Sequence, residues 1–163
     1  FRLGTVYGLS DIYSRLRMDL VVNILTTHAQ KLNKITVYGG EQHRPLIHVK
    51  DIALAIEKVV DLDVTGVFNL HSLNTTVKDI AYTVKTHFPN LIIETTGVKF
   101  QDNRSYRVSS EKAQKLFNFK PIYTLDDGIS EIKNLLESGR IKDVFESNYS
   151  NAEHLRSFGD KFF

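Results

Sequence analysis

The residues best suited to bind an anion lie in one short stretch, from Gly39 to Asp51. Arg44 stands directly before Pro45, and a proline pushes the residue before it toward an extended conformation. A planar, permanently charged guanidinium held at the mouth of a loop suits a phosphate or carboxylate ligand. The alternative is a surface arginine in an ordinary turn, because the glycines that open the stretch permit a tight turn.

A second group of polar residues precedes and enters a helix, which the apolar spacing predicts over residues 19–32. Arg17 lies just before this helix, where cations and free backbone N–H groups can receive a phosphate. Asn23 lies one turn inside among apolar side chains, so its carboxamide requires a partner. Arg17 and Asn23 are therefore candidate ligand contacts.

Two further polar residues of the first stretch are expected to be structural. His48 is a single histidine in an apolar strand, where a hydrogen-bonded core residue is the commoner role. Asp51 is placed to open a helix as its N-cap or first-turn acid.

The elements that must position these residues alternate between strands and helices. Hydrophobic periodicity and turn residues predict strands over 1–7, 35–38, 66–70 and 91–94, the third of them buried on both faces. They predict helices over 19–32, 52–60 and 77–88, one capped by Ser109 that runs to Phe117, and one capped by Thr124 that stops near Gly139. This alternation indicates an α/β fold, and the few strands suit the end of a larger parallel sheet.

Composition limits the functional classes. The chain has 163 residues, 42% of them hydrophobic, which is enough for one domain with a core. A net charge of +2 is too balanced to indicate nucleic acid or membrane binding, and no signal peptide or transmembrane run is visible, so we expect a cytoplasmic protein. With no cysteine and no i,i+4 pair among six histidines, disulfides are excluded and no metal site is expected.

The stretch Tyr-Gly-Gly-x-Gln-x-Arg-Pro-x-Ile-His-Val-x-Asp-Ile-Ala, which begins at Tyr38, resembles the signature of extended short-chain dehydrogenases/reductases, the NAD-dependent nucleotide-sugar epimerase/dehydratase family. The resemblance covers nearly the whole chain but only the second half of that family's fold. It implies an α/β fold, the C-terminal part of a Rossmann-like enzyme: the last parallel strands plus a small mixed α/β substrate-binding subdomain. We expect residues 1–137 to form this region and residues 138–163 to form a C-terminal tail.

The resemblance also implies site residues. In the family, the arginine that matches Arg44 grips the diphosphate of the nucleotide sugar. The loop after the first strand lies beside the nicotinamide and the sugar, which implies cofactor contacts for Gly4, Thr5 and Val6, with Thr5 also a substrate contact. Thr5 stands where members often have Asn, and an ordinary strand threonine is the alternative.

A second cationic segment is implied by the same resemblance. Family members usually carry an arginine shortly before the aspartate of the segment that starts at Lys99. Lys99 stands at that spacing, and Arg104 lies just after the aspartate, so either cation is expected to pair with Arg44 around a pyrophosphate. The alternative is a solvated polar loop.

The family's catalytic elements are missing from these residues. None of the seven tyrosines has a lysine four positions later, and no G-x-x-G-x-x-G occurs. We therefore expect no catalytic residue in the chain, NAD or NADP held mainly by an N-terminal half that lies upstream, and a fragment that is inactive alone. The intact protein would act on a nucleotide sugar, and the resemblance allows a homodimer. The alternatives are a non-catalytic nucleotide-binding or assembly module, or a relative with a non-nucleotide substrate.

Overall fold

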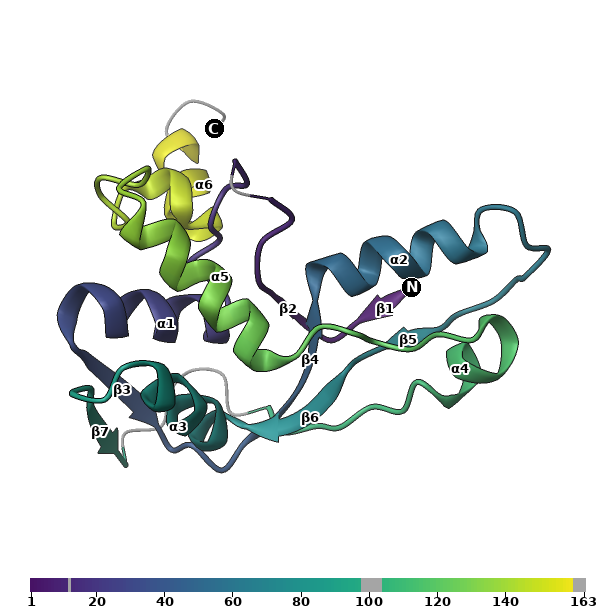
Figure 1. Ribbon diagram of the computed structural model, residues 1–163, viewed down its shortest axis with the longest axis horizontal. Helices are drawn as coiled ribbons and strands as arrows, with labels where there is room; N and C mark the ends of the chain where they lie inside the picture. The colour runs from purple at the N-terminus through teal and green to yellow at the C-terminus, as the bar shows by residue number, and fades with distance from the viewer. Residues whose placement is uncertain (12, 98–103, 160–163) are drawn as a thin grey trace.

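The computed structural model describes residues 1–11, 13–97 and 104–159 (Figure 1). The strands are β1 (Arg2–Leu3), β2 (Thr5–Tyr7), β3 (Lys34–Tyr38), β4 (His43–His48), β5 (Asn69–Leu70), β6 (Leu73–Thr76) and β7 (Ile92–Thr96). The helices are α1 (Val21–Leu32), α2 (Val49–Val59), α3 (Val77–His87), α4 (Glu111–Phe117), α5 (Leu125–Glu137) and α6 (Asn151–Gly159). The alternation that the sequence predicted is confirmed.

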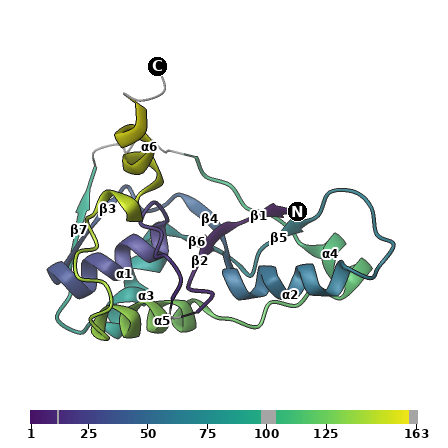
Figure 2. The ribbon, with the colours of Figure 1, turned by 90° about the horizontal axis from the view of Figure 1, so that it is seen from above.

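The strands form three small sheets, and most of their pairings are parallel. β1 pairs with β5 and β3 pairs with β7, both in parallel. In the middle of the molecule β4 lies between β2, to which it is parallel, and β6, to which it is antiparallel. Figures 1 and 2 show α1, α3 and α5 gathered near β3 and β7, with α2 and α4 at the opposite end.

The predicted strand over residues 1–7 is interrupted at Gly4. A Cβ on Gly4 would lie 2.9 Å from the carbonyl oxygen of Pro45, so the backbones approach too closely for a side chain. The interruption allows β1 to pair with β5 while β2 pairs with β4. The first seven residues therefore serve two different sheets.

Two other expectations about strands were wrong. The stretch up to Pro45 was expected in a loop, but His43, Arg44 and Pro45 belong to β4 together with the apolar segment around His48, and β6 was not predicted at all. The segment 66–70 is not buried on both faces, because Phe68 and Leu70 are buried but Val67 is 52% exposed. One face of this segment is therefore solvated.

Three clusters of buried apolar residues form the core. The largest joins α1, α3 and α5 to β2, β3 and β4. A second joins the residues after β2 to α5 and to Ile141 and Val144 of the C-terminal segment. The third lies between α2, α4 and β5.

The C-terminal segment packs against the loop that follows β2. The N–H of Met18 donates to the carbonyl of Tyr149 at 2.7 Å, and the guanidinium of Arg140 donates to the carbonyl of Ser14 at 2.7 Å. Asp19 accepts hydrogen bonds from Ser150 and from the N–H of Asn151, so it caps the start of α6. In the part of the chain that the structure describes, no helix is both long and apolar enough to cross a lipid bilayer.

The predicted cap of α5 is confirmed as a reciprocal capping box. The hydroxyl of Thr124 accepts from the N–H of Asp127 at 3.2 Å, and the N–H of Thr124 donates to the Asp127 carboxylate at 2.8 Å. The Thr124 hydroxyl also donates to the Asp127 carboxylate at 2.6 Å, and this bond together with that from the Thr124 N–H holds the pKa of Asp127 below its usual range. The cap fixes the start of the helix that crosses the core.

We predict that Thr124→Ala lowers the free energy of unfolding by about 1 kcal/mol, because a helix N–H loses its acceptor. Urea unfolding of both proteins measures the change. Thr83→Ala is the matched control, because the Thr83 hydroxyl bonds back to the carbonyl of Asp79 inside α3 and alanine is a better helix former. Equal losses in the two variants would contradict the capping role.

Candidate functional site

Arg44 lies in β4 in the extended conformation that Pro45 favours, and its side chain is not on the surface. It is 9% exposed, so the alternative of a surface arginine was wrong. Its Nη1 donates to the carbonyl of His43 at 3.0 Å and to the carbonyl of Arg104. Its Cζ lies 6.0 Å from the centre of the Tyr106 ring. The guanidinium therefore joins β4 to the segment that follows residue 103.

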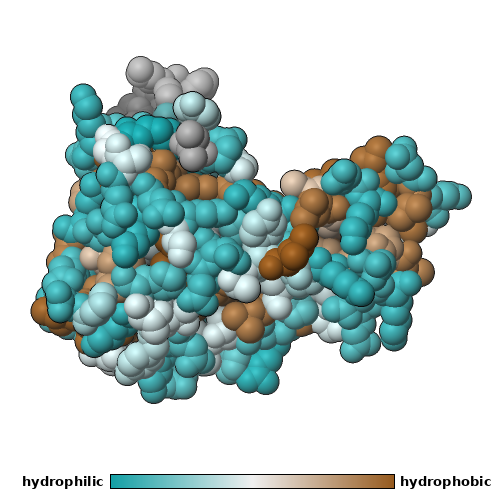
Figure 3. All heavy atoms as spheres, viewed as in Figure 1, coloured by the Kyte–Doolittle hydropathy of each residue, from teal (hydrophilic) through white to brown (hydrophobic). Residues whose placement is uncertain are grey.

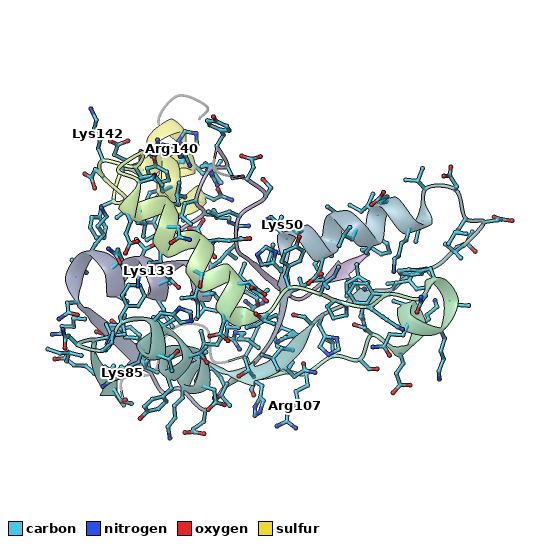
Figure 4. All side chains as sticks on the ribbon, in the orientation of Figure 1. Lys50, Lys85, Arg107, Lys133, Arg140 and Lys142 are labelled. Carbon is cyan, nitrogen blue, oxygen red and sulfur yellow. The ribbon has the colours of Figure 1, made fainter. Side chains whose placement is uncertain are left out.

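That segment brings further cations to the start of β4. The Nη2 atom of Arg107 lies 2.6 Å from Nε2 of His43, and the backbone N–H of His43 donates to the hydroxyl of Ser105 at 3.1 Å. Arg107 projects below β6 in Figure 4. Arg104 meets Arg44 through its main-chain carbonyl, and the predicted pairing of the two cations around a pyrophosphate stays a prediction. Lys99 lies outside the described residues.

Thr5 lies on the strand next to Arg44. Thr5 in β2 pairs with Leu46 in β4, and Arg44 precedes Leu46 by two residues. Because strand side chains alternate between faces, Thr5 and Arg44 share one face of the sheet. Val6 pairs with Ile47 on the other face and packs against the third core cluster, while Gly4 is buried beside Pro45.

Asn23 and Arg17 belong to a different part of the structure. Asn23 is 2% exposed; its oxygen accepts from the N–H of Gly8 at 3.3 Å, and its nitrogen donates to the carbonyl of Arg17 at 3.1 Å. It thus has the partners that its burial requires. The Arg17 guanidinium forms an exposed ion pair with Asp19 at 3.3 Å. Both residues shape the loop after β2, which the C-terminal segment covers.

Glu131 of α5 connects three elements. It was not among the residues predicted from the sequence. Its carboxylate accepts from Leu9 N at 3.1 Å, His48 Nε2 at 3.0 Å and Lys50 Nζ at 2.6 Å. Figure 4 shows Lys50 where α2 meets the loop after β2. Burial alone would raise the pKa of Glu131, but the hydrogen bonds from Lys50 and Leu9 hold it below its usual range. No local pattern marks Glu131, because its partners are distant in the sequence.

His48 is structural, as expected, and its ring has a defined tautomer. It is fully buried, and its Nδ1 accepts from the N–H of Lys50 at 3.2 Å, so His48 is the N-cap of α2. The proton is therefore on Nε2, which donates to Glu131. Asp51 is a first-turn acid of α2, and its carboxylate accepts from the backbone N–H groups of Ile122 and Tyr123.

We predict that the free energy of unfolding falls as the pH drops below about 6.5, the ordinary pKa of histidine. Burial lowers the pKa of His48, and Glu131 offsets only part of this effect. The unfolded chain therefore binds a proton that the folded protein does not bind. The free energy of unfolding falls by up to about 1.4 kcal/mol per pH unit for each such group. Burial lowers the pKa of His28 and His71 in the same direction.

His48→Asn tests this assignment, because the asparagine oxygen retains the cap and cannot titrate. Urea unfolding at several pH values between about 5.5 and 7.5 gives the slope of stability against pH. In the variant, this slope is expected to correspond to the uptake of about one proton fewer on unfolding. An unchanged slope would assign the pH dependence to the other histidines.

The fold of the chain is similar to that of solved nucleotide-sugar enzymes. The chain is similar to an NAD-dependent NDP-hexosamine 5,6-dehydratase involved in tunicamycin biosynthesis (TM-score 0.73, 18% identity, 87% of this chain and 46% of that chain). It is similar to dTDP-glucose 4,6-dehydratase from Bacillus anthracis in complex with NAD (TM-score 0.69, 25% identity, 84% of this chain and 43% of that chain). It is also similar to UDP-glucose 4-epimerase from Thermotoga maritima with UDP-glucose (TM-score 0.70, 22% identity, 84% of this chain and 45% of that chain).

These comparisons establish the fold. The chain has the fold of the C-terminal part of extended short-chain dehydrogenases/reductases that act as nucleotide-sugar dehydratases and epimerases, as the motif around Arg44 predicted. It spans less than half the length of each of the three structures. No model of a protein family matches the chain.

Proposed function

We propose that this chain is the substrate-binding portion of an NAD- or NADP-dependent nucleotide-sugar epimerase, dehydratase or reductase. Arg44 and the cationic segment that contains Arg104 would neutralise the diphosphate, and Lys99 is proposed to join them. Thr5 would contact the sugar side. The observation that supports this most directly is the buried Arg44 guanidinium, which shares a face with Thr5 and touches the Arg104 main chain.

The physical argument rests on the surroundings of Arg44. A guanidinium with little exposure loses part of its hydration, so an anion gains more from it than from a solvated cation. Tyr106 and the hydrogen bonds to two carbonyls restrict the side chain, so little conformational entropy remains to be lost on binding. Remote binding energy of this kind positions the sugar for chemistry elsewhere.

The residues of this chain fit one wall of a nicotinamide site and not a whole one. Thr5 and Val6 are half-buried in β2, whereas Gly4 is buried beside Pro45 and offers only its main chain. Hydride transfer would be supplied by the bound NAD or NADP. Burial raises the pKa of Tyr7 to about 12, so this tyrosine is unsuited to act as a base.

Arg17 and Asn23 are proposed to serve the nucleotide through the loop after β2. Asn23 fixes Gly8 and the Arg17 carbonyl, and Arg17 remains half-exposed at the surface. We further propose residues 1–137 as the substrate-binding region and residues 138–163 as a C-terminal segment that supports this loop. The intact protein would be cytoplasmic.

Exposed apolar surface supports the proposal that an NAD-binding half packs against this chain. Phe1 and Leu3 of the β1 region, Ile56 of α2, and Val60 and Val67 beyond it are 45–70% exposed. Figure 3 shows apolar surface at the end of the molecule that contains α2. Packing this surface against a second half would remove it from water.

Calorimetric titration with UDP, uridine and inorganic pyrophosphate tests the diphosphate site. We expect UDP and pyrophosphate to bind and uridine to bind much more weakly. Raising the salt concentration should weaken the binding of both anions, because the attraction is electrostatic. Equal binding of UDP and uridine, or no binding of either anion, would contradict the proposal.

A non-catalytic module of the same fold is the second candidate, because none of the tyrosines has a lysine four positions later. This candidate also binds UDP, so titration does not separate the two. The sequence of the natural polypeptide upstream of Phe1 does. A glycine-rich turn and a Tyr-x-x-x-Lys there would support the enzyme, and their absence from the natural polypeptide would support the module.

A further inference from the structure

The segment from Arg104 to Ser110 has no regular secondary structure, yet it is tied to the sheet along its length. It runs beside β6 toward α4 (Figure 1). At its start the N–H of Tyr106 donates to the carbonyl of His43 at 3.4 Å, and the Arg104 carbonyl accepts from Arg44. Because the segment is mostly exposed, these bonds and few apolar contacts hold it.

The side chain of Asn74 makes the central attachment. Asn74 lies on β6 opposite Pro45, next to the pair formed by Arg44 and Thr75. Its oxygen accepts from the N–H of Val108 at 3.0 Å, and its nitrogen donates to the carbonyl of Val108 at 2.9 Å. The carboxamide therefore pairs with one residue as a neighbouring strand would, through both a donor and an acceptor.

The second N–H of Asn74 fixes a histidine at the far end of the segment. Its nitrogen lies 3.0 Å from Nε2 of His71, which must accept, so the ring proton is on Nδ1. Nδ1 then donates to the hydroxyl of Ser110 at 2.6 Å, and the same hydroxyl accepts from the N–H of His71 at 2.9 Å. Both N–H groups of the Asn74 amide and its oxygen are thus used on Val108 and on His71, which contacts Ser110.

We propose that Asn74 is a positioning residue for the anion site: it sets the register of residues 104–108 and thereby holds the Arg104 main chain against Arg44 and the Arg107 side chain against His43. The proposal rests on the proposed function, since it assumes that these arginines bind a diphosphate. Asn74 itself makes no contact with the ligand. Its effect passes through the main chain of Val108.

Asn74→Ala removes the hydrogen bonds that the Asn74 side chain makes to Val108 and His71. Asn69→Ala is the matched control. Asn69 donates to the carbonyl of Ser109 on the same segment, but through a single exposed bond of 3.4 Å. Calorimetry with inorganic pyrophosphate and with UDP, at low and high salt, measures affinity. Amide hydrogen exchange of Tyr106 and Val108 measures how firmly the segment is held.

We expect Asn74→Ala to weaken pyrophosphate binding by about ten-fold and to speed exchange at Val108 by a similar factor, as expected for the loss of partly buried hydrogen bonds. The salt dependence of the affinity should become smaller, because the segment's cations no longer contribute. Mere loss of stability would not change that salt dependence. Asn69→Ala should alter each quantity by less than about two-fold.

Wild-type affinity and salt dependence in Asn74→Ala would overturn the proposal, as would unchanged exchange at Val108. If Asn74→Ala does not fold, Asn74→Thr replaces it, since threonine suits a strand and cannot make the paired bonds. If the wild-type chain binds neither anion, the proposed function fails, and the exchange measurement still decides whether Asn74 holds the segment.

Discussion

Replacing Arg44 with alanine is expected to weaken UDP binding by about a hundred-fold, or roughly 3 kcal/mol, because the desolvated cation that we propose for the diphosphate site is lost. Arg44→Lys retains the charge but not the planar fork, and we expect it to recover only part of the affinity. Calorimetric titration of the three proteins with UDP measures the effect. The same variants should change pyrophosphate binding in parallel.

Arg44→Ala also removes the donor to the carbonyls of His43 and Arg104. We therefore expect a loss of stability of about 1–3 kcal/mol, so urea unfolding must show that the variant is folded at the titration temperature. Arg156→Ala is the matched control, because it removes the same charge from an exposed position on α6. Arg44→Ala with the affinity of Arg156→Ala would remove Arg44 from the site.

Replacing Gly8 with alanine is expected to be the most destabilising single substitution that we propose. Gly8 has a φ of +80°, and a Cβ there would lie 2.0 Å from Nε2 of His48. The buried ring cannot move without breaking its bonds to Glu131 and Lys50. We expect Gly8→Ala to cost at least about 3 kcal/mol, from backbone strain and from loss of this network.

Gly139→Ala separates the two causes. Gly139 also has a positive φ, of +72°, but a Cβ there meets nothing within 4 Å. It should cost only about 1 kcal/mol, the strain of a left-handed alanine. Urea unfolding of the two variants gives the difference, which reports the clash with His48. Equal costs would show that the ring at position 48 is not held as described.

Several features followed from the sequence because they depend on neighbours within a few residues. The helix over 77–88 was predicted from apolar spacing, and α3 starts directly after Thr76, whose side chain caps it. Asn33 ends α1 in the left-handed conformation, which asparagine tolerates at the end of a helix. Pro45 acts on the residue before it, so the extended backbone of Arg44 was also predictable.

Burial and pairing were decided by the tertiary structure. Arg44 was placed in a loop, because a short segment with a proline resembles a turn, and only pairing with β2 and β6 makes it a buried strand residue. Gly4 was not identified as a break, since the carbonyl of Pro45 that excludes a side chain belongs to another strand. The alternation at Val67 depends on which face its neighbours cover.

The same distinction separates the parts of the candidate site. The residue types and their order around Arg44 marked a cation suited to a phosphate or carboxylate, and the family resemblance implied a diphosphate; neither inference required a long-range contact. Glu131 contacts Leu9, which lies 122 positions away in the sequence, and Asn74 contacts Val108, which lies 34 positions away. No local pattern points to either role. Periodicity and caps act over one or two helical turns, whereas hydrogen bonds between distant segments exist only after the chain has folded.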